Sequence, residues 1–140
     1  MNRNQEIGML GERLAVKYLE KKKYIILERN YRCRQGEMDI IAKDNEEIVF
    51  IEVKTRTTIN FGRPAEAVNY IKREHLHNIA RYYLYTKKIT KIPIRFDVIE
   101  IYLSKKEYAV NHIKQIMWIK TNCKYRKDIR TWYLIVNLVK

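Results

Sequence analysis

The chain has 140 residues, 46% of them hydrophobic, and a net charge of +13 from 29 Lys and Arg against 16 Asp and Glu. This length suits one domain with its own core and is too short for two. No apolar run approaches the ~20 residues that a membrane span needs. The positive excess favours a polyanionic partner, nucleic acid ahead of an anionic membrane surface. The N-terminus lacks an apolar signal-peptide region, so we expect a cytoplasmic protein whose two cysteines stay reduced.

The predicted elements begin with a helix over 6–21, where apolar residues recur at helical spacing. Asn4 is its expected N-cap, and the three lysines at 21–23 suit its C-terminus. A strand is predicted from Tyr24 toward Tyr31. The chain therefore opens with one helix and one strand, which lead into a turn.

A β-hairpin follows, and it is the most informative pattern in the chain. Two short apolar runs, 38–42 and 48–53, flank a polar stretch, which is typical of two strands joined by a tight turn. If residues 45–46 form the loop, the register puts Asp39 directly opposite Glu52. Directly opposed carboxylates repel each other, and apolar neighbours raise the cost of their charges.

The two faces of this hairpin are predicted to differ, because side chains alternate along a strand. One face is wholly apolar and carries Met38, Ile40, Ala42, Val49, Ile51 and Val53. The other face carries four charged residues at the end far from the turn: Glu37, Asp39, Glu52 and Lys54. A divalent cation bound there would turn repulsion into coordination. The alternative is a solvated strand end at which the lysine neutralises Glu37.

Further along, residues 55–63 are loop-like, and Pro64 suits the first turn of a second helix. Apolar spacing continues this helix to about residue 84. The run 94–103 predicts another strand, whereas 108–119 fits a strand or a helix equally well. Elements in this order predict an α/β fold, a central mixed β-sheet flanked by helices.

The charged end of the hairpin suits phosphodiester cleavage. That reaction needs a metal ion, a group that orients or deprotonates water, and positive charge for the developing anion. Asp39 and Glu52 are the candidate ligands for Mg²⁺ or Mn²⁺, and Lys54 can position the attacking water or support the phosphate. Glu12 is a third candidate, because Gly11 beside it would let the first helix approach the sheet closely. Periodicity alone favours a solvated glutamate at that position.

Several stretches together carry a family resemblance: 8–12, 29–32, 36–42, 49–56, 61–64 and 95–99. They resemble the YraN-type family of small bacterial proteins, which is similar to the PD-(D/E)XK nuclease superfamily and, within it, to archaeal-type Holliday-junction resolvases. The resemblance implies a restriction-endonuclease-like core. It also implies that Asp39, Glu52 and Glu12 are metal ligands and that Lys54 is the catalytic lysine. Met38 stands where the superfamily motif has a proline.

Four basic residues around this region are candidates for phosphate contact: Arg56, Arg63, Lys72 and Arg95. Asp97 is expected to be structural. Residues 1–116 are predicted to form the core domain and 117–140 a basic, aromatic extension. The extension suits nucleic acid through phosphate contact and stacking, and it equally suits a segment docked on the core or a contact in a homodimer.

The main functional hypothesis is therefore a metal-dependent nuclease that acts on DNA, including branched or otherwise structured DNA. The alternative is a non-catalytic nucleic-acid-binding module that keeps the nuclease fold. A third hypothesis is an interaction protein whose acidic cluster is structural.

Overall fold

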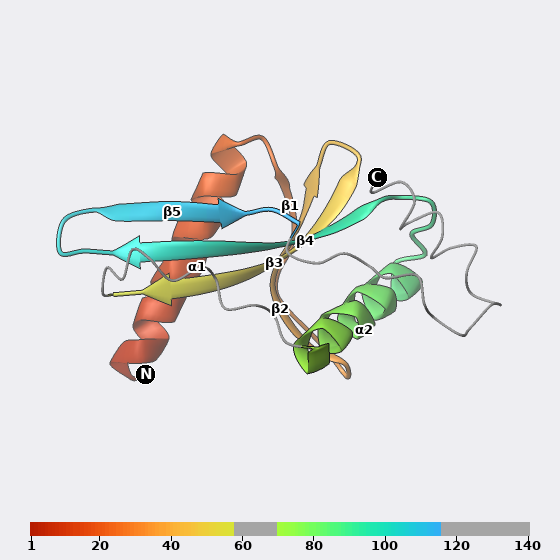
Figure 1. Cartoon of the computed structure of the whole chain (residues 1–140), viewed down its shortest axis with the longest axis horizontal. Coiled ribbons are helices and arrows are strands. Elements are labelled where there is room, and N and C mark those ends of the chain that lie inside the picture. Colours follow the sequence, from red (N-terminus) through yellow and green to blue (C-terminus); the bar gives the residue numbers. More distant parts are fainter. Residues whose placement is uncertain (58–69, 116–140) are drawn as a thin grey trace.

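The structure, a computed structural model, describes residues 1–57 and 70–115, with side chains from residue 74 onward in the second segment. The elements are α1 (Arg3–Lys21), β1 (Ile25–Cys33), β2 (Gly36–Asp44), β3 (Glu47–Arg56), α2 (Tyr70–Thr86), β4 (Ile94–Leu103) and β5 (Tyr108–Ile113) (Figure 1). The predicted order of elements is confirmed, and the ambiguous segment after residue 108 supplies β5. The predictions on Pro64 and on the extension after residue 116 lie outside the described residues.

Helix α1 begins earlier than predicted. Asn2, and not Asn4, is the N-cap, and its side chain accepts a hydrogen bond of 2.9 Å from the backbone N–H of Gln5. The Gln5 side chain accepts one of 3.0 Å from the backbone N–H of Asn2. This reciprocal pair satisfies two helix-end donors at once. The prediction for Asn4 was wrong because apolar periodicity starts a turn inside the helix.

The five strands form one sheet in the order β1-β2-β3-β4-β5. Neighbouring strands are antiparallel except for β3 and β4, which are parallel and are joined through α2. A parallel neighbour needs such a crossover, whereas antiparallel neighbours need only a turn. This mixed sheet with helices confirms the predicted α/β class.

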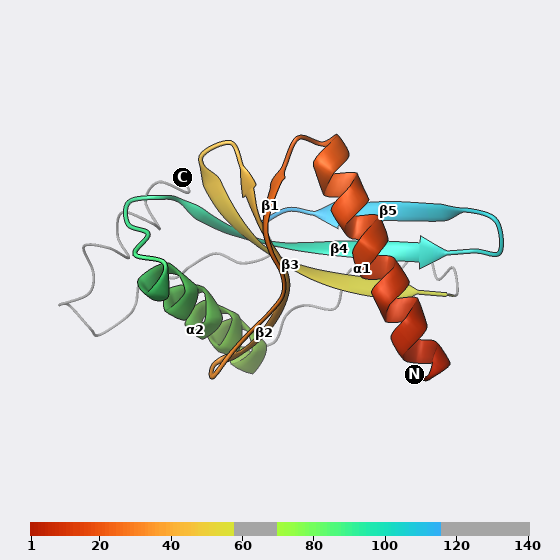
Figure 2. The ribbon, with the colours of Figure 1, turned by 180° about the vertical axis from the view of Figure 1, so that it is seen from behind.

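The two helices lie on opposite faces of the sheet, as the front and back views show (Figures 1 and 2). One apolar cluster joins α2 to Ile41, Phe50 and Phe96. The other joins α1 to a second set of strand residues, among them Val49 and Ile51. Both faces of the central strands are therefore buried, as is typical of strands in α/β folds. Neither described helix has the length and apolar character of a membrane-crossing helix.

The hairpin register is confirmed from the turn as far as Ile40 opposite Ile51, and the predicted pairing of Asp39 with Glu52 is not among the observed pairs. Beyond that point β2 continues its pairing with β1. Met38 also leaves the predicted apolar face, because it packs in the α2 cluster while Ile40 packs in the α1 cluster. Strand alternation does not hold across the point where β2 parts from β3.

Candidate functional site

Asp39 occupies the point where β2 separates from β3. Its Oδ2 accepts a hydrogen bond of 2.8 Å from the backbone N–H of Val53. The carboxylate thereby takes a backbone donor that the sheet ladder would otherwise satisfy. This contact holds the Asp39 side chain against β3 at Val53, the residue that follows Glu52.

Helix α1 brings Glu12 to the same place. The helix lies very close to β3 at Gly11, where an added Cβ would stand 1.8 Å from Oγ1 of Thr55. A cleft of about 290 Å³ lies beside this contact. Its lining residues are Asn4, Ile7, Gly8, Glu12, Asp39, Val53, Thr55 and Thr57. Two of the predicted ligands, Glu12 and Asp39, therefore line one cleft.

The electrostatics of Asp39 are unfavourable to its charge. Burial raises the pKa of Asp39 above its ordinary value of 3.8, and the hydrogen bond from Val53 opposes that rise. The negative charges of three glutamates raise the pKa further: Glu12, Glu52 and Glu37, in decreasing order. Asp39 is thus a partly buried carboxylate among other carboxylates, the arrangement that a bound cation would relieve.

Glu52 and Lys54 form the second part of the predicted site. Lys54 Nζ lies 3.4 Å from Glu52 Oε1, and the two side chains are 34% and 23% exposed. Strand alternation puts them on the face of Phe50, which packs toward α2, because Thr55 faces α1. Glu37 instead pairs with Arg32, at 3.4 Å. The alternative in which Lys54 neutralises Glu37 is therefore not observed.

The predicted catalytic residues come from α1, from β2 where it parts from β3, and from β3. Asp39 and Glu12 line the α1 cleft, and strand alternation turns Glu52 and Lys54 toward the Phe50 side of β3. The charge of Glu52 still acts on Asp39, together with that of Glu12. The predicted regular pairing of Asp39 with Glu52 is not observed, because β2 parts from β3 at this point. Across residues 1–57 and 70–115, no group of three or more His, Cys, Asp or Glu side chains is placed to hold a metal ion. The ligand and catalytic roles of these four residues stay predictions.

The residues predicted to contact phosphate have different outcomes. Arg56 is 42% exposed and lies 3.6 Å from Glu100. Arg63 and the side chain of Lys72 lie outside the described part of the chain. The prediction for Arg95 is corrected, since this residue is only 9% exposed and its charge is engaged within the protein.

The partners of Arg95 come from three strands and from the residue that precedes β1. Its guanidinium donates to Asp97 at 2.9 Å, to Asp44 at 3.1 Å and to Tyr24 at 2.8 Å, and it also pairs with Glu47. Asp97 accepts further bonds from His112 and from the backbone N–H of Gln115. The expectation that Asp97 is structural is confirmed.

Sequence reasoning missed Glu100, which is 1% exposed in β4. Its Oε2 accepts hydrogen bonds from Tyr102 at 2.8 Å and from Asn111 at 3.0 Å. A signal was available, because Glu100 is the one charged residue in the stretch 98–103 of β4, where it lies between Ile99 and Ile101. A charge at such a position is buried only with partners.

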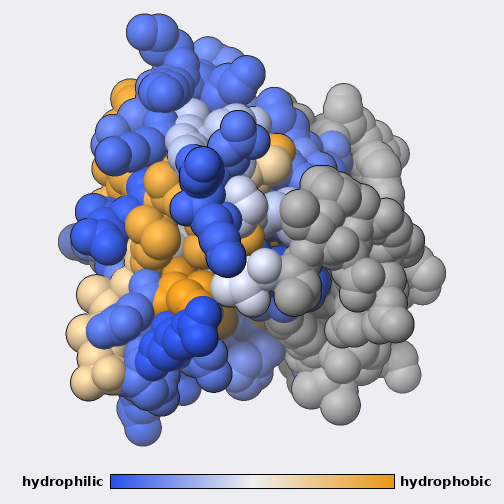
Figure 3. Space-filling model, turned by 90° about the vertical axis from the view of Figure 1, so that its left-hand side faces the viewer, coloured by the Kyte–Doolittle hydropathy of each residue, from blue (hydrophilic) through white to orange (hydrophobic). Residues whose placement is uncertain are grey.

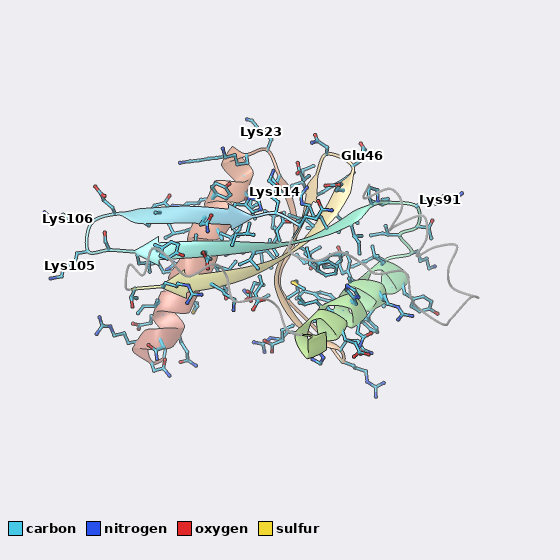
Figure 4. The ribbon with its side chains drawn as sticks, in the orientation of Figure 1. Lys23, Glu46, Lys91, Lys105, Lys106 and Lys114 are labelled. Atoms are coloured by element: carbon cyan, nitrogen blue, oxygen red, sulfur yellow. The ribbon has the colours of Figure 1, made fainter. Side chains whose placement is uncertain are left out.

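Basic side chains stand out on the periphery of the fold. The labelled lysines of the loops and turns extend away from the sheet, at Lys23, Lys91, Lys105 and Lys106 (Figure 4). All four are exposed. Among the side chains that are coloured in Figure 3, hydrophilic ones predominate, with hydrophobic ones between them. The four exposed lysines contribute to the net charge of +13.

Comparison with known proteins places these features in a family. Residues 11–101, more than half of the chain, match the "Uncharacterised protein family UPF0102". A UPF0102 protein of Clostridioides difficile strain 630 is 50% identical over 110 residues, which are 79% of this chain and 95% of that relative. A UPF0102 protein of Alkaliphilus oremlandii is 50% identical over 113 residues, 79% of this chain and 97% of that relative.

Among solved structures, the chain is similar to one titled "Crystal structure of SSO0001". The two are 18% identical with a TM-score of 0.34, and the match covers 81% of this chain and 53% of that one. The α/β class follows from the sheet topology described above. The coverage and identity of the sequence relatives are decisive, and they confirm the resemblance drawn from the motifs: this chain belongs to the UPF0102 family, the YraN-type family.

Proposed function

We propose that this protein is a metal-dependent nuclease that hydrolyses phosphodiester bonds in DNA, branched or otherwise structured DNA included. The observation that carries the proposal is the position of Asp39. It lies beside β3, and the charges of both Glu12 and Glu52 raise its pKa. A carboxylate held among others, with a lysine on the next strand, suits metal-assisted phosphodiester hydrolysis.

The donor set fits Mg²⁺ or Mn²⁺. Mg²⁺ is commonly held by one or two carboxylates, with water and substrate phosphate completing its six positions, and an all-protein cage is unusual for it. Asp39 with either Glu12 or Glu52 supplies such a set, so a group of three ligands is not needed in advance. When bound, the ion would polarise the phosphate and lower the pKa of a coordinated water.

The protein's own residues have distinct tasks in this proposal. The backbone N–H of Val53 holds the Asp39 carboxylate in one orientation. Glu52 restrains the ammonium group of Lys54 through their 3.4 Å ion pair. That ammonium stabilises the negative charge that develops on the phosphate during attack. Gly11 allows α1 to carry Glu12 into the cleft.

A cleavage panel tests this proposal. Linear, nicked, flapped and four-way DNA are incubated with Mg²⁺, with Mn²⁺ and with chelator. We expect metal-dependent cleavage in the wild type and its loss in Asp39→Asn, Glu52→Gln and Lys54→Ala. Glu46→Gln is the matched control, because this exposed carboxylate lies at the β2–β3 turn (Figure 4) and is not among the residues that line the cleft. Full activity in all three site variants contradicts the proposal.

The second candidate is a non-catalytic nucleic-acid-binding module that keeps the nuclease fold. Two observations favour it: the net charge of +13, and the lack, in the described part of the chain, of a group of three His, Cys, Asp or Glu side chains placed to hold a metal ion. This candidate predicts salt-sensitive DNA binding without cleavage under any metal condition. The same panel, run beside a binding assay, separates the two candidates.

A further inference from the structure

We propose that Glu100 is a positioning residue for Arg56, and that Arg56 and Lys54 together form a phosphate-binding face on the α2 side of β3 and β4. This inference rests on the proposed function, because the phosphate belongs to the DNA backbone. It assigns a role to a buried carboxylate in the strand beside the candidate catalytic lysine.

Glu100 is directly next to that lysine. The parallel register pairs Lys54 with Glu100 and Arg56 with Tyr102. Residues two apart on a strand project from the same face, so Lys54 and Arg56 lie on one side of β3. Glu100 is on the same side of β4, the side of Phe96, which packs toward α2. The two cations and the carboxylate therefore share one face of the sheet.

The Glu100 carboxylate is held on one side and directed on the other. Its Oε2 accepts the hydrogen bonds from Tyr102 and Asn111, at 2.8 and 3.0 Å. Its Oε1 is buried and accepts no hydrogen bond among the described residues. That oxygen lies 3.6 Å from an Arg56 guanidinium nitrogen. Two neutral donors thus fix the carboxylate so that its second oxygen faces one cation.

A carboxylate with 1% exposure is costly and needs compensation. The compensation here comes from a guanidinium that is itself 42% exposed. At 3.6 Å the contact is longer than a hydrogen bond, so it attracts the guanidinium without using its N–H donors. Beside its interaction with Tyr102, Arg56 keeps donors for a planar, two-bond contact with phosphate.

Restraint of Arg56 before binding has a measurable benefit. A free arginine loses side-chain entropy when a ligand immobilises it, and a pre-positioned one loses less. The pKa of the Tyr102 hydroxyl supports the restraint, because its hydrogen bond to Glu100 raises that pKa and Arg56 lowers it. Tyr102 therefore interacts with both residues of the pair.

The sign of one substitution separates positioning from masking. If Glu100 only neutralised Arg56, its replacement by an uncharged residue would strengthen DNA binding. If Glu100 positions Arg56, the same replacement weakens binding although it removes a negative charge. Binding is measured by fluorescence anisotropy on labelled duplex and four-way DNA in the presence of chelator, so cleavage does not enter the result.

We expect Arg56→Ala to raise the Kd about five-fold at ~0.1 M salt and to reduce the salt slope by about one. We expect Glu100→Gln to raise the Kd about three-fold, and to have no further effect in the Arg56→Ala background, because coupled residues are not additive. Tighter binding by Glu100→Gln, or equal effects in the two backgrounds, overturns the inference.

Tyr102→Phe keeps the test decisive if Glu100→Gln does not fold. It removes the 2.8 Å bond to Glu100 and keeps the ring. We expect it to weaken binding only when Arg56 is present. An equal loss in the Arg56→Ala background means that the hydroxyl acts on DNA directly, which also overturns the inference.

The exposed pair of Arg32 and Glu37 is the matched control. Its atoms lie 3.4 Å apart, and its side chains are 76% and 69% exposed. Glu37→Gln removes the same charge without releasing a buried partner, so we expect unchanged or tighter binding. If the wild type shows no salt-sensitive DNA binding, the proposed function fails. If the wild type binds and the Glu100–Arg56 effects are additive, only this inference fails.

Discussion

Asp39 in β2 and Asp97 in β4 are aspartates of one sheet, yet their surroundings shift the two carboxyl pKa values in opposite directions. Burial alone would raise the pKa of Asp97, but hydrogen bonds from His112, Arg95 and the backbone of Gln115 outweigh it and lower the pKa. At Asp39, burial and the charges of three glutamates outweigh the bond from Val53 and raise the pKa. One carboxylate has its partners within the fold, and the other is surrounded by like charge. Residues that depart from local energetic rules in this way are where function is expected.

Removal of the Arg95 side chain, which binds Asp97, should give the largest change in the free energy of unfolding. Arg95→Ala leaves Asp97, Asp44 and Glu47 without their shared cation. Breaking a buried pair in this way costs about 3–5 kcal/mol, so the free energy of unfolding should fall by that amount in urea denaturation. Arg32→Ala, at an exposed pair, should change it by about 0.5 kcal/mol or less. Equal effects of the two substitutions would contradict the assignment of Arg95 as a structural residue.

Metal addition should act on Asp39 and not on Asp97. At a concentration of about 100 Kd, a ligand that binds only the folded state adds about 2.7 kcal/mol of stability. We expect Mg²⁺ or Mn²⁺ to raise the Tm of the wild type in thermal denaturation. Asp39→Asn should lose this response, whereas Glu46→Gln should keep it. An undiminished metal response in Asp39→Asn would remove that residue from the proposed site.

Two glycines in α1, Gly11 and Gly8, test whether the close approach of the helix to β3 positions Glu12 near Asp39. Gly11→Ala forces a Cβ to 1.8 Å from Thr55 Oγ1. The helix must then move from β3, so we expect a loss of about 1–3 kcal/mol of stability. We also expect reduced cleavage, since Glu12 moves with the helix. Gly8→Ala is the control: its Cβ meets nothing within 4 Å, and higher helix propensity should stabilise by up to about 1 kcal/mol. Loss of stability in both variants would mean that Gly11 has no special role in this approach.

The smallest effects concern pH in the absence of metal. A raised carboxyl pKa means that ionisation of Asp39 costs stability, a cost present above the folded pKa and absent well below the unfolded value of 3.8. Asp39→Asn should therefore stabilise the protein at neutral pH and have no such benefit at acid pH. Asp97 has a lowered pKa, so its contribution is present above 3.8 and is lost as the pH falls through the folded pKa. Urea denaturation of Asp39→Asn and Asp97→Asn across this range should show opposite signs at neutral pH.

Much of this fold could be predicted from the sequence because its main elements depend on local pattern. The hairpin turn, the register up to Ile40 and the apolar stripe of α2 follow from alternation and helical spacing. The approach of Glu12 to Asp39 was also predictable, because Gly11 marks a close contact. These features depend on residues close in the chain or on a residue type with one strong preference.

The remainder depended on contacts between distant segments. Arginine is usually found at the surface. Arg95 is buried because it binds the carboxylates of Glu47 and Asp44, which lie about fifty positions earlier in the chain. Glu100 acquires its role only when β4 lies parallel to β3 and β5 supplies Asn111. The separation of β2 from β3 at Asp39 could not be predicted, because alternation describes a strand that stays paired with its neighbour.

Strand β4 carries one buried acid toward each helix, Asp97 on the α1 side and Glu100 on the α2 side. A slip of this strand by one position would exchange its faces, and both acids would lose their donors together. Each acid would then be a bare charge in an apolar layer, at a cost that far exceeds any gain from repacking. The two acids, which face opposite sides of the sheet, therefore favour a single register of β4. That register sets the neighbours of Lys54 and Arg56 on β4, which are Glu100 and Tyr102.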